Sequence, residues 1–258
     1  MKYLKIFISI SILSLIFIID YYNKYYKPNT SFEDESIFLY VMEDDSLAFK
    51  DSISKYIKSE KTFYKVAERL EYLQNKKTGR FKIDKDIGNN GIVNSLKFNN
   101  TPVNVTFNNQ ERVEDLAGRV SKQIYQDSTA LLFAFRDKKF LKDNNLNEQN
   151  VLSIFIPNSY NIFWNSTPED FRDRMLAEYN KFWNEERSKK AEELGLTRLE
   201  VISLASIVQI ESRRNDERPR VAGLYINRLK KNMKLQADPT VIYTCLLYTS
   251  PSPRDAQL

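Results

Sequence analysis

The chain has 258 residues, enough for one large or two modest domains, and its 42% hydrophobic and 13% aromatic content argues against wholesale disorder. Its net charge is +5, but the basic residues are interspersed with 34 acidic ones, so we expect a solvated surface and no nucleic-acid partner. Histidine is absent, which excludes a Ser-His-Asp triad and His-ligated metals. We expect no metal and no cofactor, and acid–base chemistry must use carboxylates, Lys or Tyr.

An apolar segment lies near the N-terminus. The run from Ile6 to Ile19 follows Lys2 and Lys5 and precedes several tyrosines, and with these flanks it approaches the roughly 20 residues that span a bilayer. The alternative is a cleaved signal peptide, but no small-residue cleavage pattern follows. We therefore predict a membrane anchor over residues 1–27, a single transmembrane helix with its N-terminus in the cytoplasm.

The next part of the chain alternates strand and helix patterns. Residues 28–35 are polar, lack periodicity and predict a linker, and residues 108–150 predict a connecting helical region. The predicted strands are 36–42, 79–83 and 103–107, and the predicted helices are 46–59, 62–74, 86–96 and 111–125. This mixture predicts an α+β fold.

Residues 151–244 are predicted to form a further domain. It should begin with a strand at 153–156 and continue with a helix from Pro168 to about 194, capped by Thr167 and ended by Gly195. Tyr160 and Trp164 lie between the two and either line a groove or stabilise the fold by packing.

One acidic residue occupies an apolar helix face. At about 100° per residue, the apolar positions between Leu204 and Val208 form a stripe, and Glu211 falls inside it. Burying an unpaired carboxylate is costly, so such a group is either neutralised by a partner or kept as a proton donor. Glu211 is therefore either a structural residue paired with Arg218 or Arg228, or a catalytic acid.

The same stretch resembles the YceG-like family of endolytic murein transglycosylases. The matching blocks are LASIV (204–208), the position of Glu211, ERPRVAG (217–223), INRL (226–229) and LQADPTVIY (235–243). Several ordered blocks at matching spacing are far more specific than one short motif. Many members carry a second acid two residues before the catalytic one, where this chain has Gln209, so the resemblance assigns catalysis to Glu211 alone.

The resemblance implies a lytic transglycosylase. Such an enzyme cleaves the β-1,4 MurNAc-GlcNAc bond within nascent peptidoglycan strands, which limits strand length and leaves 1,6-anhydroMurNAc ends. One acid suffices, because Glu211 can protonate the glycosidic oxygen and then accept the proton of the attacking C6 hydroxyl. Two alternatives stay open: a muramidase that uses water, and a non-catalytic membrane-anchored peptidoglycan-binding protein.

Five further residues are candidates for substrate binding. Arg218 and Arg228 either bind acidic groups of the substrate or form structural ion pairs. Asn227 offers its amide to a sugar, and Gln236 lies in a loop where its side chain can enter a cleft. Asp238 precedes a proline and either stabilises oxocarbenium charge or forms the turn.

The resemblance also implies an organisation and partners. The order strand, helix, helix, strand within residues 36–107 resembles a LysM-like subdomain, and residues 151–244 correspond to the YceG-like catalytic domain. The implied partners are peptidoglycan glycan strands, peptidoglycan synthases (penicillin-binding proteins) and the inner membrane. The implied location is the bacterial inner (plasma) membrane, single-pass, with the catalytic part in the periplasm.

Residues 245–258 do not resemble the family's continuation. The stretch CLLYTSPSPRD (245–255) resembles the translation of a transposase-type sequencing adapter, so we expect native sequence to end near Thr244. The catalytic domain is then incomplete, and the chain as given is expected to be inactive. Cys245, the sole cysteine, then carries no redox or catalytic information.

Overall fold

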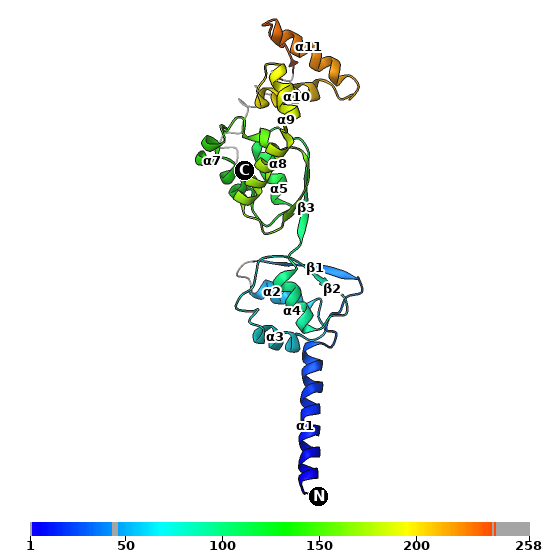
Figure 1. Cartoon of the computed structure of the whole chain (residues 1–258). Coiled ribbons are helices and arrows are strands. Elements are labelled where there is room, and N and C mark those ends of the chain that lie inside the picture. Colours follow the sequence, from blue (N-terminus) through cyan, green and yellow to red (C-terminus); the bar gives the residue numbers. More distant parts are fainter. Residues whose placement is uncertain (1, 43–45, 239, 241–258) are drawn as a thin grey trace, which may run out of the picture. The chain divides into compact units, whose positions relative to one another are not determined.

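The computed structural model describes residues 2–42, 46–238 and 240. These residues divide into two compact units, shown with their elements in Figure 1. The first comprises Met1–Asp137 and Pro157–Arg172, and the second comprises Lys138–Ile156 and Asp173–Leu258. The chain therefore passes between the units more than once, so the units do not correspond to consecutive segments of the sequence.

Helix α1 (Lys2–Tyr25) occupies the predicted apolar segment. Its stretch Tyr3–Tyr25 has the length and composition to cross a membrane, a test that a signal sequence near an N-terminus also passes. The start of the following segment, 28–35, packs against the rest of the first unit. Asn29 and Thr30 are buried, and the backbone N–H of Asn29 donates to the carbonyl of Ile87 at 2.9 Å. Residues 31 and 33–35 of the same segment are exposed, as their polar composition predicts.

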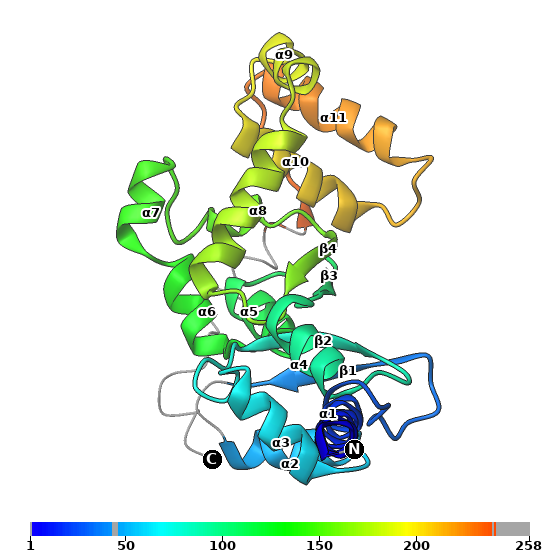
Figure 2. The same cartoon turned by 60° about the horizontal axis from the view of Figure 1, so that its bottom comes forward.

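The first half of the first unit is a two-stranded sheet with helices on one face. Strands β1 (Ser36–Val41) and β2 (Gly79–Asp84) are antiparallel, with Ser36 opposite Asp84 and Val41 opposite Gly79. The helices are α2 (Ser46–Ser54), α3 (Glu60–Arg69) and α4 (Asn89–Phe98). Figure 2 shows α4 beside β2. The inward side chains of both strands form one core with helix residues such as Phe63 and Ile92.

The remaining elements of the first unit are a second strand pair and two helices. Strands β3 (Pro102–Phe107) and β4 (Asn158–Phe163) are antiparallel, and the helices are α5 (Val113–Ser121) and α6 (Ser128–Phe135). The strand expected at 153–156 is wrong. Ser153 and Ile154 end a short 3-10 helix, Val151–Ile154, and the next two residues are irregular. The Asn147 side chain accepts from the backbone N–H groups of Gln149 and Asn150 at 2.9 and 3.0 Å, and this turn starts the helix.

The second unit is helical. Its elements are α7 (Lys138–Asp143), the later part of α8 (Pro168–Phe182), α9 (Glu185–Glu193), α10 (Arg198–Glu211) and α11 (Arg218–Lys230). The long helix expected from Pro168 is therefore broken near 183. Asn184 ends it, because its side chain accepts from the N–H of Arg187 at 2.9 Å and starts α9. The predicted cap at Thr167 and the stop at Gly195, which has φ 70°, are confirmed.

Candidate functional site

Helix α10 carries the predicted catalytic residue and begins at a capping box. The Glu200 N–H donates to Thr197 Oγ1 at 3.2 Å, and the Thr197 N–H donates to Glu200 Oε2 at 2.7 Å. These bonds from Thr197 lower the pKa of Glu200 below its usual value, because they favour the ionised carboxylate. The N-terminus of α10 is therefore fixed in position.

Glu211 is the last residue of α10. Leu204 and Val208 of the predicted stripe are buried, at 8% and 6% exposure, but Glu211 is exposed. The expectation that its carboxylate lies within the apolar face is wrong. The stripe is packed only as far as Val208, and the helix ends at Glu211. The carboxylate is open to a ligand instead.

A turn of polar contacts joins α10 to α11. Ser212 is buried, and its hydroxyl donates to Glu217 Oε2 at 3.0 Å. Arg218 Nε donates to the carbonyl of Ser212 at 3.2 Å. Arg218 therefore fixes the backbone directly after Glu211.

Tyr225 of α11 lies against the catalytic candidate. Its side chain is 3% exposed and packs with Leu204 and Val208, while its hydroxyl lies close enough to Glu211 for the carboxylate to influence it. Burial raises the pKa of Tyr225, the negative charge of Glu211 raises it further, and the positive charge of Arg228 opposes them.

The segment after α11 is held by Arg228. Its Nη1 donates to the carbonyl of Leu235, and Ala237 is buried in the same cluster as Tyr225. Gln236, between them, is exposed and has φ 52°, in the left-handed region that non-glycine residues seldom adopt. Asp238 is exposed and contributes to the charge felt by Tyr225.

The structure thus brings some of the predicted residues together and leaves others apart. Glu211, Arg228 and Asp238 all act on the Tyr225 hydroxyl. Asn227 is exposed on α11, and nothing in the geometry links its side chain to this group. Within the described part of the chain, Glu211 forms no ion pair with Arg218 or Arg228, whose guanidinium groups bond to backbone carbonyls.

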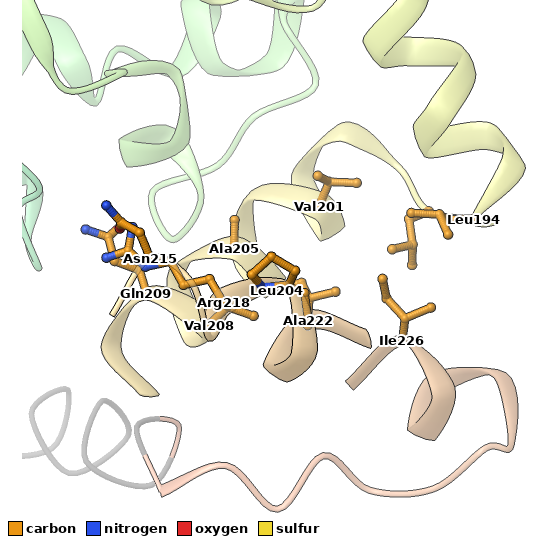
Figure 3. A pocket seen from close by; sticks show the side chains of 12 residues that line it. Leu194, Val201, Leu204, Ala205, Val208, Gln209, Asn215, Arg218, Ala222 and Ile226 are labelled. Atoms are coloured by element: carbon orange, nitrogen blue, oxygen red, sulfur yellow. The ribbon is translucent and has the colours of Figure 1, made fainter. Parts of the chain in front are cut away.

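A cavity of about 490 Å³ lies between α10 and α11, and Leu204 and Val208 are among the residues that line it. Figure 3 shows its two ends: Gln209, Asn215 and Arg218 gather at one, and Leu194 and Ile226 lie at the other. Glu211 is not among the residues that line it. Across the described ranges, no group of three or more His, Cys, Asp or Glu residues is arranged to hold a metal ion.

Tyr225 is the residue that sequence reasoning missed. It sits in helix α11 among aliphatic residues such as Val221 and Ala222, so its spacing predicts only a core position. A signal was present, because a buried tyrosine hydroxyl ordinarily finds a hydrogen-bond partner. The partner could not be named without knowing how α11 folds back on α10.

The fold and the site define a mixed α+β protein with an exposed acid at the end of α10, close to a buried tyrosine. The model of the YceG-like family matches residues 46–254, so the chain belongs to the YceG-like family. The matched range ends within 245–258, the segment expected to be a non-native tail, which lies outside the described residues.

Curated relatives share part of the chain. A protein of Streptococcus pneumoniae serotype 2 (strain D39 / NCTC 7466) named endolytic murein transglycosylase is 32% identical over 91 residues, which cover 34% of this chain and 16% of the relative. One of Bacillus subtilis (strain 168) with the same name is 33% identical over 76 residues, covering 29% of this chain and 21% of the relative. The matched part thus spans about a fifth or less of the length of these relatives.

A solved structure has a similar fold. It is the 2.6 Å crystal structure of the yceG-like protein lmo1499 from Listeria monocytogenes, with a TM-score of 0.51 and 17% sequence identity. The match covers 88% of this chain and 81% of that chain. At this identity the likeness concerns the fold alone.

Proposed function

We propose that this protein is a lytic transglycosylase that cleaves the β-1,4 MurNAc-GlcNAc bond within nascent peptidoglycan strands and so limits their length. The observation that carries the proposal is the Glu211 carboxylate, exposed at the end of α10 and close to the hydroxyl of the buried Tyr225. It lies in a chain of the YceG-like family whose relatives are named endolytic murein transglycosylase.

The reaction needs one group that first donates and then accepts a proton. Glu211 protonates the glycosidic oxygen as the bond to C1 of MurNAc breaks, and GlcNAc leaves with a new hydroxyl. The C6 hydroxyl of the same MurNAc then attacks C1 and gives its proton to the Glu211 carboxylate. The acid is regenerated, and a 1,6-anhydro ring forms without water.

Tyr225 and Asp238 assist this chemistry in different ways. The Tyr225 hydroxyl holds one orientation of the Glu211 carboxylate, because its own ring is fixed in the core. The negative charge of Asp238 favours the positive charge that develops on the sugar ring in an oxocarbenium-like transition state.

Substrate binding is assigned to the polar residues around the acid. Asn227 and Arg228 lie on α11, and Gln236 lies on the following segment, whose backbone Arg228 holds. Arg218 lies at the polar end of the cavity, where it can bind a carboxylate of the peptide. Each of these side chains can donate hydrogen bonds, and the oxygen atoms of sugars and peptide carboxylates can accept them.

The surroundings of the site follow from the same proposal. Helix α1 anchors the protein in the inner membrane with the catalytic part in the periplasm, and peptidoglycan synthases that produce nascent strands are the partners. The antiparallel β1 and β2 with α2 and α3 between them have the order of a LysM-like subdomain. The runner-up is a non-catalytic peptidoglycan-binding protein, favoured by the absence of Glu211 from the cavity lining.

The test compares Glu211→Gln with a matched control, Glu193→Gln, an exposed carboxylate on α9. Because the sequence after Thr244 is expected to be non-native, both variants are made in the gene product as its genome encodes it. Isolated peptidoglycan is digested, and the ends are weighed by mass spectrometry. We expect anhydromuramyl ends, lighter by one water than hydrolysed ends, from the parent and the control, and at least a hundredfold fewer from Glu211→Gln.

Other outcomes separate the alternatives. Reducing ends alone would identify a muramidase that uses water. Retained binding with no cleavage by the parent protein would favour the non-catalytic wall-binding protein. Full activity of Glu211→Gln would remove this residue from the mechanism.

A further inference from the structure

The outward face of β1 is aromatic. Leu39 and Val41 point into the core, whereas the alternate residues Phe38 and Tyr40 are 41% and 44% exposed. The solvent-facing side of an antiparallel sheet ordinarily carries polar residues. Two neighbouring aromatic side chains in these positions therefore need an explanation outside the stability of the core.

The facing positions of β2 are cationic. Lys82 lies opposite Phe38 in the strand register, and Arg80 lies opposite Tyr40. The Arg80 guanidinium carbon lies 3.6 Å from the centre of the Phe38 ring, and Arg80 has no carboxylate partner within the described ranges. Lys82 pairs with Asp84 at 3.0 Å, but both side chains are exposed, and such pairs exchange readily with solvent or ligands.

A tryptophan extends the aromatic row. The centres of the Tyr40 and Trp164 rings are 5.0 Å apart, and the centre of the Tyr125 ring also lies 5.0 Å from that of Trp164. Next to Trp164, the Asn165 side chain accepts from Asn100 Nδ2 at 3.0 Å, which fixes the loop. We call the residues Phe38, Tyr40, Arg80, Lys82 and Trp164 the outer sheet face. Their rings are held in place before any ligand binds.

We propose that the outer sheet face binds peptidoglycan strands that still carry their peptides, as a site separate from Glu211. A pyranose ring presents a face of C–H groups that stacks on aromatic rings, and the peptide carboxylates are complementary in charge to Arg80 and Lys82. The proposal rests on the proposed function for its substrate class. The combination of rings and cations selects an acidic glycopeptide rather than a neutral polysaccharide.

The experiment measures binding in the Glu211→Gln background, so that no strand is cut. The full-length protein in detergent is titrated with soluble, uncrosslinked glycan strands that carry peptides. Phe38→Thr combined with Tyr40→Thr removes the rings while keeping residues that favour strands. Arg80→Gln removes the unpaired charge, and Phe133→Ala, at a 76% exposed aromatic of α6, is the matched control.

We expect the double variant to bind about tenfold more weakly, since two exposed aromatic contacts are lost. Arg80→Gln should bind less tightly and with a smaller salt dependence, and Phe133→Ala should bind like the parent. On strands whose peptides have been removed by an amidase, the effect of Arg80→Gln should disappear and the effect of the double variant should remain.

Three results would overturn the proposal. One is unchanged affinity of the double variant, with circular dichroism that shows an intact fold. Another is an equal loss in Phe133→Ala. The third is that the variants lose binding to anionic lipid vesicles but not to glycan, which would make the face a membrane surface. If the parent protein binds strands through this face but never cuts them, the proposed function fails and this site remains.

Discussion

At the scale of single residues, the contact between Tyr225 and Glu211 gives an exposed carboxylate a fixed neighbour. An exposed side chain at a helix end ordinarily samples several rotamers. Most of these rotamers would orient the carboxylate wrongly relative to the glycosidic bond and so slow the reaction. The tyrosine ring is locked in the core, so its hydroxyl restrains Glu211 without burying it. An acid that must both give and take a proton benefits from staying within reach of water and substrate.

The first prediction measures this contact by a double-mutant cycle. Tyr225→Phe and Glu211→Gln are made singly and together, and unfolding free energies are measured with denaturant. We expect a coupling energy of about 0.5–1.5 kcal/mol, typical of a hydrogen bond that ends on a charged but exposed group. The same cycle with Glu193→Gln in place of Glu211→Gln should give a coupling near zero. A zero value in both cycles would mean that the hydroxyl does not restrain Glu211.

The second prediction concerns the backbone at Gln236. Its φ of 52° costs a residue with a side chain about 1 kcal/mol, and glycine adopts it freely. Gln236→Gly should therefore raise the unfolding free energy by up to about 1 kcal/mol. If the side chain binds substrate, the same variant should lose affinity for glycan strands. Asn232→Gly, also at φ 52°, is the control, and it should leave glycan binding unchanged.

At the scale of elements, the capping box of α10 sets the position of the catalytic candidate from fourteen residues away along the chain. The third prediction is that Thr197→Ala lowers the unfolding free energy by about 1 kcal/mol, because the N–H of Glu200 loses its acceptor. Ser206→Ala, an exposed position in the middle of the same helix, should be neutral or slightly stabilising. Equal losses in the two variants would show that the cap is not the cause.

The fourth prediction gives the capping box a pH dependence. The pKa of Glu200 is below its ordinary value of 4.5 in the folded protein, so its carboxylate stabilises the fold above that pH. The contribution is lost as the pH falls through the folded-state pKa. The stability difference between the parent and Glu200→Gln should therefore be constant near neutral pH and shrink below about 4.5. A difference that grows on acidification would contradict the assignment.

Much of the element pattern follows from the sequence, because β1, β2, β3 and α10 have clear periodicity and clear ends. Failures occurred where a polar side chain bonds to its own backbone: Asn147 turns a predicted strand into a short helix, and Asn184 divides a predicted long helix. The position of Glu211 on α10 was predictable. Its exposure and its tyrosine partner were not, because both depend on how α11 packs.

At the scale of the whole molecule, Gly88 packs against the backbone at the end of α1, where this helix meets the rest of the first unit. A Cβ added there would lie 2.6 Å from the carbonyl carbon and oxygen of Tyr26, and these are backbone atoms that cannot turn aside. The fifth prediction is that Gly88→Ala destabilises the protein by about 1–3 kcal/mol, the usual cost of overpacking. Gly118→Ala, with open space around its Cβ, should stabilise α5 instead.

The same junction has a mechanical consequence. Asn89 Nδ2 donates to the carbonyl of Lys24 at 2.7 Å, so the last turn of α1 is bonded to α4 rather than followed by a slack tether. With α1 in the bilayer, as proposed, β1 and β2 are attached to the membrane helix rigidly and not through a flexible linker. The outer sheet face would then contact glycan only at one fixed distance from the lipid headgroups. Such a protein would bind only strands that lie at this distance from the membrane, whatever their chemical structure.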